Sequence, residues 1–282
     1  MSQLVVRPAR AEDKPVILAF CQQTFSWGDY IAEVWERWLQ STSGQLLVAT
    51  IDTQPVGVVF AELLGNRAAW MAGMRVDPDY RRHGVASALD QAARDFGRAH
   101  DCRIARLATS TKNIPAQTLL EKIGYRRVAR FNEWEVDAAP NDFSRWRVAQ
   151  TNDIELILVS WSNSEIQITG HSLAPDEHWR WREIDSARLR QHIDAKEIRV
   201  SERNWGMAVA HQDGDWSGLL IHAAVGDTQA IFEFAVAMRG ESNHRGFKHV
   251  EAMLPDLAIV NEAMARAEYQ SDSGMLIYEC AL

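Results

Sequence analysis

Two arginines, a histidine and a glycine stand side by side at residues 81–84, within the stretch V-D-P-D-Y-R-R-H-G-V-A-S. From Gly84 onward apolar residues recur every three or four positions, which predicts a helix, and the residues up to Val76 are typical of a strand. The first amides of a helix have no partner within it, and the helix dipole favours negative charge there. This strand-to-helix turn could therefore bind an anion such as a pyrophosphate.

The residue types of the turn suit such a ligand. Arg81 and Arg82 would add positive charge, and the small residues Gly84 and Ala86 would let a ligand approach the main chain closely. The alternative is that both arginines are solvated residues of an ordinary turn, because short motifs also match by chance. The strands and helices expected on either side of the turn distinguish between these two interpretations.

Those elements follow from periodicity and turn residues. Strands are expected at residues 4–7, 45–51, 55–64, 68–76 and 102–108, with a strand pair over 125–136. Gly65-Asn66 predicts a hairpin between two of the strands. Helices are expected at residues 31–39, from Gly84 onward, and between Pro115 and Gly124. The turn is thus expected to lie between a strand and a helix of an α/β fold.

This succession resembles the GCN5-related N-acetyltransferase (GNAT) superfamily over residues 4–136. The matching motifs are V-R-P-A-R-A-E-D at 6–13, V-x-P-x-x-R-R-x-G-x-A at 76–86, and N-x-x-A followed by E-K-I-G-Y at 113–125. The resemblance implies an α/β (α+β) fold in which a mixed, mostly antiparallel twisted sheet is flanked by helices. It also implies direct transfer of an acetyl group from acetyl-CoA to an amine, in a ternary complex.

The resemblance further implies which residues bind the cofactor. The arginine turn should bind the pyrophosphate of acetyl-CoA, and the fourth strand, which diverges from the fifth in this family, should bind the pantetheine arm through its main chain. The implied cofactor-binding residues are Met74, Arg75, Val76, Arg81, Arg82, His83, Gly84, Val85, Ala86, Ser87, Asn113 and Ala116. Asn113 could equally be a helix cap before Pro115.

The family's usual acid and base are missing from their usual places. The position of the common tyrosine is Leu120, and the fourth strand, A-A-W-M-A-G-M-R-V, has no glutamate. Candidate replacements are Glu62, Asp29, Tyr30 and Glu135, although charged residues are more often surface or structural residues. Orientation of the reactants could also supply much of the catalysis.

The segment W-G-D-Y-I-A-E-V-W-E-R-W-L lies where family members form the acceptor pocket. Trp27, Trp35 and Trp38 could line that pocket, and Asp29 or Glu33 could attract an ammonium group. The alternative is an amphipathic helix with Trp35 and Trp38 in the core.

The second half of the chain repeats the first. R-V-A-Q-T-N-D at 147–153 matches R-P-A-R-A-E-D at 7–13, and V-A-H-Q-D-G-D-W-S-G from Val209 matches V-A-T-I-D-T-Q-P-V-G from Val48. A duplication predicts a catalytic domain over 1–140 and a related domain over 141–282. The changing spacing of the matches indicates an insertion within 154–208 and a loss later on. We expect the second domain to lack the pyrophosphate-binding turn and helix and to bind no cofactor.

Composition limits the possible partners. A net charge of −8 over 282 residues argues against a nucleic-acid-binding protein and suits a small amine as acceptor. The three cysteines lack metal-ligand or disulfide spacing, so we expect no metal site. The sequence has no apolar run of membrane-spanning length and no secretory signal, so a cytoplasmic protein is expected. The alternative from another class is a non-catalytic acyl-CoA sensor or partner-binding protein. A second alternative is an enzyme that transfers longer acyl groups, for which the small residues Ala72 and Gly73 leave room.

Overall fold

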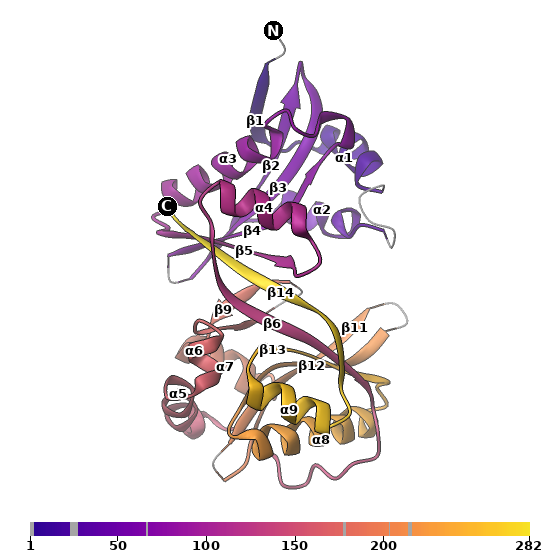
Figure 1. Cartoon of the computed structure of the whole chain (residues 1–282), viewed down its shortest axis with the longest axis vertical. Helices are drawn as coiled ribbons and strands as arrows, with labels where there is room; N and C mark the ends of the chain where they lie inside the picture. Colours follow the sequence, from indigo (N-terminus) through magenta and orange to yellow (C-terminus); the bar gives the residue numbers. More distant parts are fainter. Residues whose placement is uncertain (1–2, 23–27, 66, 177–178, 203, 214–215) are drawn as a thin grey trace. The chain divides into compact units, whose positions relative to one another are not determined.

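The computed structural model divides into two compact units, which are described separately (Figure 1). It describes residues 3–22, 28–65, 67–176, 179–202, 204–213 and 216–282. Unit 1 comprises Met1–Leu107, Thr118–Arg126 and Tyr278–Leu282, and unit 2 comprises Ala108–Gln117 and Arg127–Ile277. The compact units therefore interleave along the chain, unlike the single boundary near residue 140 that the repeat suggests.

Unit 1 contains a mixed sheet with the strand order β1-β2-β3-β4-β5, and the end of β14 (Gln270–Ala281) lies next to β5. The strands are β1 Leu4–Pro8, β2 Gly44–Ile51, β3 Gln54–Leu64, β4 Ala68–Val76 and β5 Ile104–Ser110. Neighbours are antiparallel except for β4 and β5, which are parallel. These strands confirm the predicted ones to within about two residues, the uncertainty usual at element ends.

Helices cover both faces of the unit 1 sheet (Figure 1). They are α1 Lys14–Cys21, α2 Ile31–Leu39 and α3 Val85–Ala99, while α4 Ile114–Lys122 has residues in both units. On the α1–α2 face, Trp38 stacks on Phe60 with ring centroids 4.7 Å apart. On the α3 face, Val85 and Leu89 pack against Gly57 of β3. Burial of each such large apolar side chain contributes about 1.5–3 kcal/mol.

Strand β4 changes course part-way along. Its pairing with β3 shifts register between Val58 and Phe60, where β4 has one extra residue and Gly73 has a φ of 63°. A Cβ on Gly73 would lie 2.5 Å from the Trp38 ring, so the bulge and the helix packing both require glycine. The pairing of β4 with β5 covers only Ala68–Trp70. Beyond that point β4 diverges from β5.

Unit 2 contains the strand order β14-β6-β13-β12-β11-β10-β7. Its strands are β6 Arg126–Asp137, β7 Arg147–Val148, β10 Ile198–Val200, β11 Trp205–Asp213, β12 Trp216–Val225 and β13 His249–Pro255, and β8 Leu173–Pro175 pairs with β9 Trp181–Glu183 in a separate hairpin. Its helices are α5 Ile154–Ser162, α6 Glu165–Thr169, α7 Ser186–Asp194, α8 Thr228–His244 and α9 Ala258–Arg266. The strand pair expected over 125–136 is wrong, because β6 is one continuous strand between β13 and β14.

The two units share one topology. The series β7-β10-β11-β12-β13 has the same sequence of directions as β1-β2-β3-β4-β5: three antiparallel steps and then a parallel one. β12 also has an extra residue against β11, beside Met207, where β4 has its bulge. Topology therefore matches β11 with β3, one strand away from the sequence match of Val209 with Val48. The duplication is confirmed, but that part of the alignment was displaced by one strand.

The predicted loss of the long helix from the second half is wrong. α8, with 17 residues, occupies the place that α3 has in unit 1. Its buried residues lie on several sides of the helix, among them Ile231, Phe234, Ala237 and Ser242. Such a helix lacks a single apolar stripe, so its sequence does not show the amphipathic repeat that indicates a helix.

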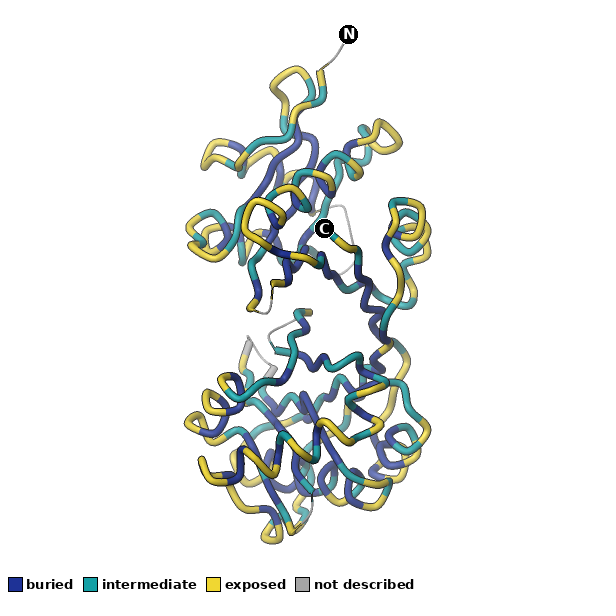
Figure 2. Tube along the Cα trace, turned by 90° about the vertical axis from the view of Figure 1, so that its left-hand side faces the viewer, coloured by how far each residue is buried: buried dark blue, intermediate teal, exposed yellow. Residues whose placement is uncertain are grey.

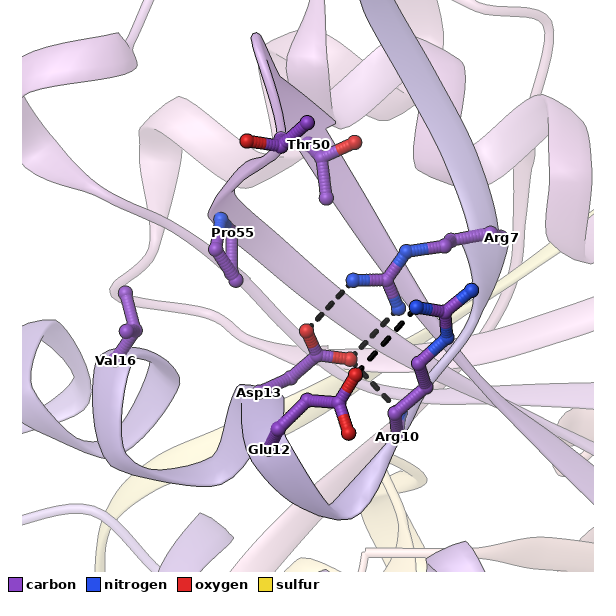
Figure 3. A pocket seen from close by; sticks show the side chains of 8 residues that line it. Arg7, Arg10, Glu12, Asp13, Val16, Thr50 and Pro55 are labelled. Carbon is purple, nitrogen blue, oxygen red and sulfur yellow. Dashed lines mark hydrogen bonds and ion pairs between the residues drawn. The ribbon is translucent and has the colours of Figure 1, made fainter.

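The best-matched repeat segment is a structural clip. The Arg7 guanidinium donates two hydrogen bonds of 2.7 Å to Asp13, whose carboxylate also accepts the Arg10 amide (Figure 3). In unit 2 the Arg147 guanidinium binds Asp153 in the same way, again at 2.7 Å. Each clip joins the first strand of its half to the 3₁₀ turn before the first helix. Repetition of this motif therefore reflects folding rather than catalysis.

The cores lie along the strands in both units, and the exposed residues concentrate on loops and outer helix faces (Figure 2). Within the described part of the chain, no helix combines the length and apolar character needed to cross a bilayer.

Candidate functional site

The arginine turn joins β4 to α3 in unit 1. After Val76, Asp77 accepts a 3.0 Å hydrogen bond from the Asp79 amide and so begins a 3₁₀ turn over Pro78–Tyr80. Arg82 and Gly84 then adopt left-handed backbone conformations, with φ of 65° and 78°. Two left-handed residues so close together reverse the chain sharply before the helix begins.

The start of α3 is open to a ligand. Gly84 is its N-cap and forms no side-chain capping bond, and a Cβ at this position would have no neighbour within 4 Å. Arg81, Arg82 and His83 are exposed, and the His83 ring is held against the Arg81 carbonyl at 2.9 Å. The amides at the start of α3, from Val85 to Ser87, have no intrahelical acceptor. Uncapped amides, the helix dipole and the arginines together form an anion-binding arrangement.

The equivalent helix of unit 2 begins differently. Asp227 caps α8, and its carboxylate accepts the Ala230 amide at 2.9 Å. An amide that is free in the α3 turn is therefore already bonded to a carboxylate in α8, and this carboxylate would repel a phosphate.

The expected cofactor-binding strand has one edge that turns away from β5. Arg75 and Val76 of β4 pair with Val58 and Gly57 of β3, and the opposite edge has separated from β5. The Met74 carbonyl accepts a 3.0 Å hydrogen bond from the Arg75 side chain. The main chain of β4 thus lies along a divergence between two parallel strands, as the resemblance implies.

A charged cluster lies beside this bulge. The Arg75 guanidinium binds Asp29 through Nε at 2.6 Å and Nη2 at 3.3 Å, and Asp29 also accepts the Ile31 amide. The side chains are 11% and 2% exposed, so the pair is almost fully desolvated. Asp29 is therefore engaged by Arg75 and the start of α2 and is not a free carboxylate for a substrate ammonium. The role of the Arg75 side chain is not expected from the family motif, and its only signal in the sequence is an arginine at an inward-facing position of a strand.

Tyr30 belongs to the same cluster. The Arg75 guanidinium lies 5.4 Å from the Tyr30 ring centroid, and the ring meets Trp38 edge-on. Burial raises the pKa of the Tyr30 hydroxyl, although Arg75 and the main chain of Gly73 act on it in the opposite direction. The phenol is therefore protonated at neutral pH and lies close to the β4 bulge.

The tryptophans of α2 do not line a pocket. Trp35 is completely buried and Trp38 is 7% exposed, both in the core cluster between α1, α2 and the sheet. The alternative interpretation, an amphipathic helix packed on the core, is the one observed. Trp27 lies outside the described residues.

Glu62 of β3 lies opposite Trp70 of β4, and directly opposed residues share a face of the sheet. By the same register Arg75, opposite Val58, lies on that face, so Glu62 is on the side of the charged cluster.

The remaining predicted positions lie on or next to α4. In unit 2, the Asn113 side chain accepts the Ala116 amide at 3.3 Å, which is the capping role that the sequence left open. In unit 1, Leu120 is buried, and the Tyr125 hydroxyl donates to the buried Asp90 of α3 at 2.9 Å. Burial raises the pKa of both Asp90 and Tyr125, so this contact ties the end of α4 to α3.

The segment that contains these elements is similar to a known protein family. Residues 14–125 match the model of the Acetyltransferase (GNAT) family. That range includes the arginine turn, the diverging β4 and the charged cluster. An N-acetylaspartate synthetase of Danio rerio is 26% identical over 105 residues, which are 37% of this chain and 37% of that protein. The chain thus spans little more than a third of this curated relative.

Solved GNAT structures share the fold of the whole chain. A GCN5-related N-acetyltransferase from Sphaerobacter thermophilus has a TM-score of 0.67 at 14% identity, covering 99% of this chain and 95% of that one. A tandem GNAT protein from the clavulanic acid biosynthesis pathway has a TM-score of 0.61 at 13% identity, covering 99% and 98%. The predicted fold class, two related GNAT-like halves in one chain, is confirmed.

Within the described residues, no group of three or more histidine, cysteine, aspartate or glutamate side chains is arranged to hold a metal ion.

Proposed function

We propose that this GNAT protein is an acetyl-CoA-dependent N-acetyltransferase that acetylates the amine of a small molecule in the cytoplasm. The observation that carries the proposal is the continuity of β4, the arginine turn and α3. One segment supplies a diverging strand edge, an uncapped helix start and two exposed arginines. A cofactor with a pyrophosphate and a long amide-containing arm matches this order of groups.

In the proposed reaction the amine nitrogen attacks the thioester carbonyl while both substrates are bound. The C–N bond forms, the C–S bond breaks, the nitrogen loses a proton, and the departing thiolate gains one. The pyrophosphate would bind the amides from Val85 to Ser87 with Arg81 and Arg82, and the pantetheine arm would follow the edge of β4. Binding both reactants in one orientation can lower the barrier by several kcal/mol, about 7 in favourable cases.

We assign the proton donor for the thiolate to Tyr30. Its hydroxyl lies by the β4 bulge, and its raised pKa keeps it protonated. Asp29 is a positioning residue, because it holds the Arg75 guanidinium that contacts the Tyr30 ring. Glu62 lies on the same face of the sheet and is proposed as the base that accepts the amine proton, directly or through water.

We propose that the acceptor is a small amine. The charged cluster offers it no isolated carboxylate that would select a strongly cationic substrate. Asp29 is neutralised by Arg75, which removes the main reason to expect a strongly cationic substrate. The name of the Danio rerio relative indicates acetylation of the amine of an amino acid. Acidic amino acids therefore belong in the test alongside polyamines and aminoglycosides.

The test is release of CoA from acetyl-CoA when a panel of such amines is offered, with mass spectrometry of the acetylated product. An enzyme converts at least one amine far faster than the uncatalysed control. Tight acetyl-CoA binding without turnover over the whole panel would instead favour the non-catalytic sensor.

A further inference from the structure

In unit 2, the hairpin β8–β9 lies at the position that corresponds to the proposed cofactor groove of unit 1. β12 and β13 correspond to β4 and β5, and their pairing covers only Gly218–Ile221 of β12. β12 continues to Val225 beyond the last paired residue, so these strands also diverge toward their carboxyl ends. The duplication has therefore preserved the divergence as well as the bulge.

The hairpin packs against both diverging strands. β8 contacts β12 and β13, and Gly170, just before β8, lies against Pro255 at the end of β13. Leu173, Ala174 and Trp181 are at most 1% exposed, and the Trp181 ring lies 5.5 Å from the Phe131 ring. The hairpin belongs to the region 154–208 that the sequence comparison identified as an insertion.

One buried guanidinium holds the two strands of the hairpin together. Arg188 of α7 is 1% exposed and donates to the carbonyls of Ala174 and Pro175 in β8. It also donates to the carbonyls of Arg182 and Glu183 in β9, the first at 2.8 Å. Asp176, at the end of β8, lies 3.8 Å from Arg188 Nε and balances part of its charge. A planar fork with five N–H donors suits this task, and lysine could not replace it.

We propose that the β8–β9 hairpin is an internal plug that occupies, in unit 2, the groove that acetyl-CoA occupies in unit 1. The term groove rests on the proposed function of unit 1. Two devices exclude the cofactor from unit 2: apolar side chains fill the space between β12 and β13, and the Asp227 carboxylate takes the anion position at α8. In this proposal the inserted segment fills the groove of unit 2 with side chains of the chain itself, so that unit 2 folds without a cofactor.

The first experiment measures hydrogen exchange of the full chain without ligand. The amides of Leu173, Ala174 and Trp181–Glu183 exchange slowly in the wild type, and Arg188→Met speeds their exchange at least tenfold. Release of the hairpin exposes apolar strand ends, so this variant also binds an apolar dye such as anilinonaphthalene sulfonate.

Arg190→Met, at an exposed position of the same helix, is the matched control and changes neither property. Arg188→Lys, which keeps the charge and loses the fork, is the second test variant and is expected to speed exchange less. Unchanged exchange in both Arg188 variants overturns the plug.

The second experiment is calorimetric titration of the full chain with acetyl-CoA. The wild type binds one molecule per chain, and Arg82→Glu binds none. Residual binding in Arg82→Glu that changes the exchange of the hairpin amides at Leu173, Ala174 or Trp181–Glu183 would place the cofactor in unit 2 and overturn the plug. Absence of binding by the wild type contradicts the proposed function alone, because the exchange experiment on the hairpin uses no cofactor.

Discussion

At the scale of single residues, Arg82 differs from an ordinary surface arginine in its place and conformation. It is exposed, has a φ of 65°, and precedes the uncapped start of α3 by two residues. Few non-glycine residues adopt this conformation, and they concentrate at functional sites. The turn therefore maintains a costly backbone geometry at a position with positive charge, two residues before the N-cap of α3.

We predict that Arg82→Glu abolishes stabilisation of the chain by acetyl-CoA. A ligand at about 100 times its dissociation constant stabilises the native state by roughly 2.7 kcal/mol, and a glutamate in the turn would repel the pyrophosphate. The measurement is the shift of the thermal melting temperature with ligand. Arg67→Glu is the control, because Arg67 is also exposed and left-handed, with a φ of 59°, and lies outside the turn. An equal ligand shift in both variants contradicts the pyrophosphate assignment.

Tyr30 carries the second prediction at this scale. If its hydroxyl protonates the thiolate, Tyr30→Phe lowers kcat by about 10²–10⁴-fold and leaves acetyl-CoA binding unchanged. Because burial raises the pKa of Tyr30 above its usual value near 10, the phenol stays protonated throughout the neutral range, and the wild-type rate has no loss near pH 7–9 from this group. A kcat within twofold of the wild type would remove Tyr30 from the mechanism.

At the scale of elements, the bulge in β4 connects helix packing to the site. Gly73 allows Trp38 to pack against the strand and places the main chain beside Tyr30. We predict that Gly73→Ala destabilises the protein by about 1–3 kcal/mol, because the new methyl group overlaps the Trp38 ring and the backbone is left-handed. Chemical denaturation measures this. Gly65→Ala, with nothing within 4 Å, should change stability by less than about 0.5 kcal/mol.

The duplicated clips predict a shared dependence on pH. The hydrogen bonds from the Arg147 side chain lower the pKa of Asp153. For Asp13, burial by itself would raise the pKa, but the hydrogen bonds from Arg7 and the Arg10 amide outweigh burial, so the pKa of Asp13 is lowered as well. A lowered folded-state pKa gives stability that is present above the unfolded value of 3.8 and is lost as pH falls through the folded value. The double variant Asp13→Asn/Asp153→Asn should therefore melt earlier than the wild type at pH 7, and the difference should shrink below pH 4. A constant difference at all pH values would show that charge is not the cause.

Local patterns predicted most elements of unit 1, since amphipathic helices and alternating strands carry their period in the sequence. The helix over 31–39 and the strand over 68–76 have the predicted bounds. Three features escaped because they depend on tertiary contacts. α8 is buried on several sides, the Asp29–Arg75 pair joins residues far apart in sequence, and β6 and β14 pair outside their own halves of the sequence repeat. For the site, the anion turn was predictable from residue types, whereas the core position of Trp35 required the packing to be known.

At the scale of the whole molecule, the last strand completes unit 1. Glu279 of β14 binds Arg106 of β5 at 2.5 Å, and both side chains are 5% exposed. The Leu282 amide donates to the Arg103 carbonyl, and Leu282 packs against Gly97 of α3. Residues distant in sequence from the rest of unit 1 thus hold the edge of the sheet next to the diverging strand β4.

We predict that Glu279→Ala destabilises unit 1 by roughly 3–5 kcal/mol, because Arg106 is left buried without this carboxylate. Hydrogen exchange of the β5 amides Ile104–Leu107 should become faster. Asp272→Ala, on the same strand, is the control. Its ion pair with Lys112 is exposed and should contribute about 1 kcal/mol or less. Similar effects of both variants would show that the buried pair has no special role.

The placement of Tyr278–Leu282 in unit 1 has a consequence for biosynthesis. A ribosome delivers Met1–Leu107 long before these residues, and all of Arg127–Ile277 emerges in between. Until then the nascent chain exposes the edge of β5 and has no Glu279 beside Arg106, and such strand edges can pair with other chains. Nascent chains arrested before Tyr278 should therefore depend on chaperones, and the proposed acetyl-CoA site should reach its final stability only when Tyr278–Leu282 have been synthesised.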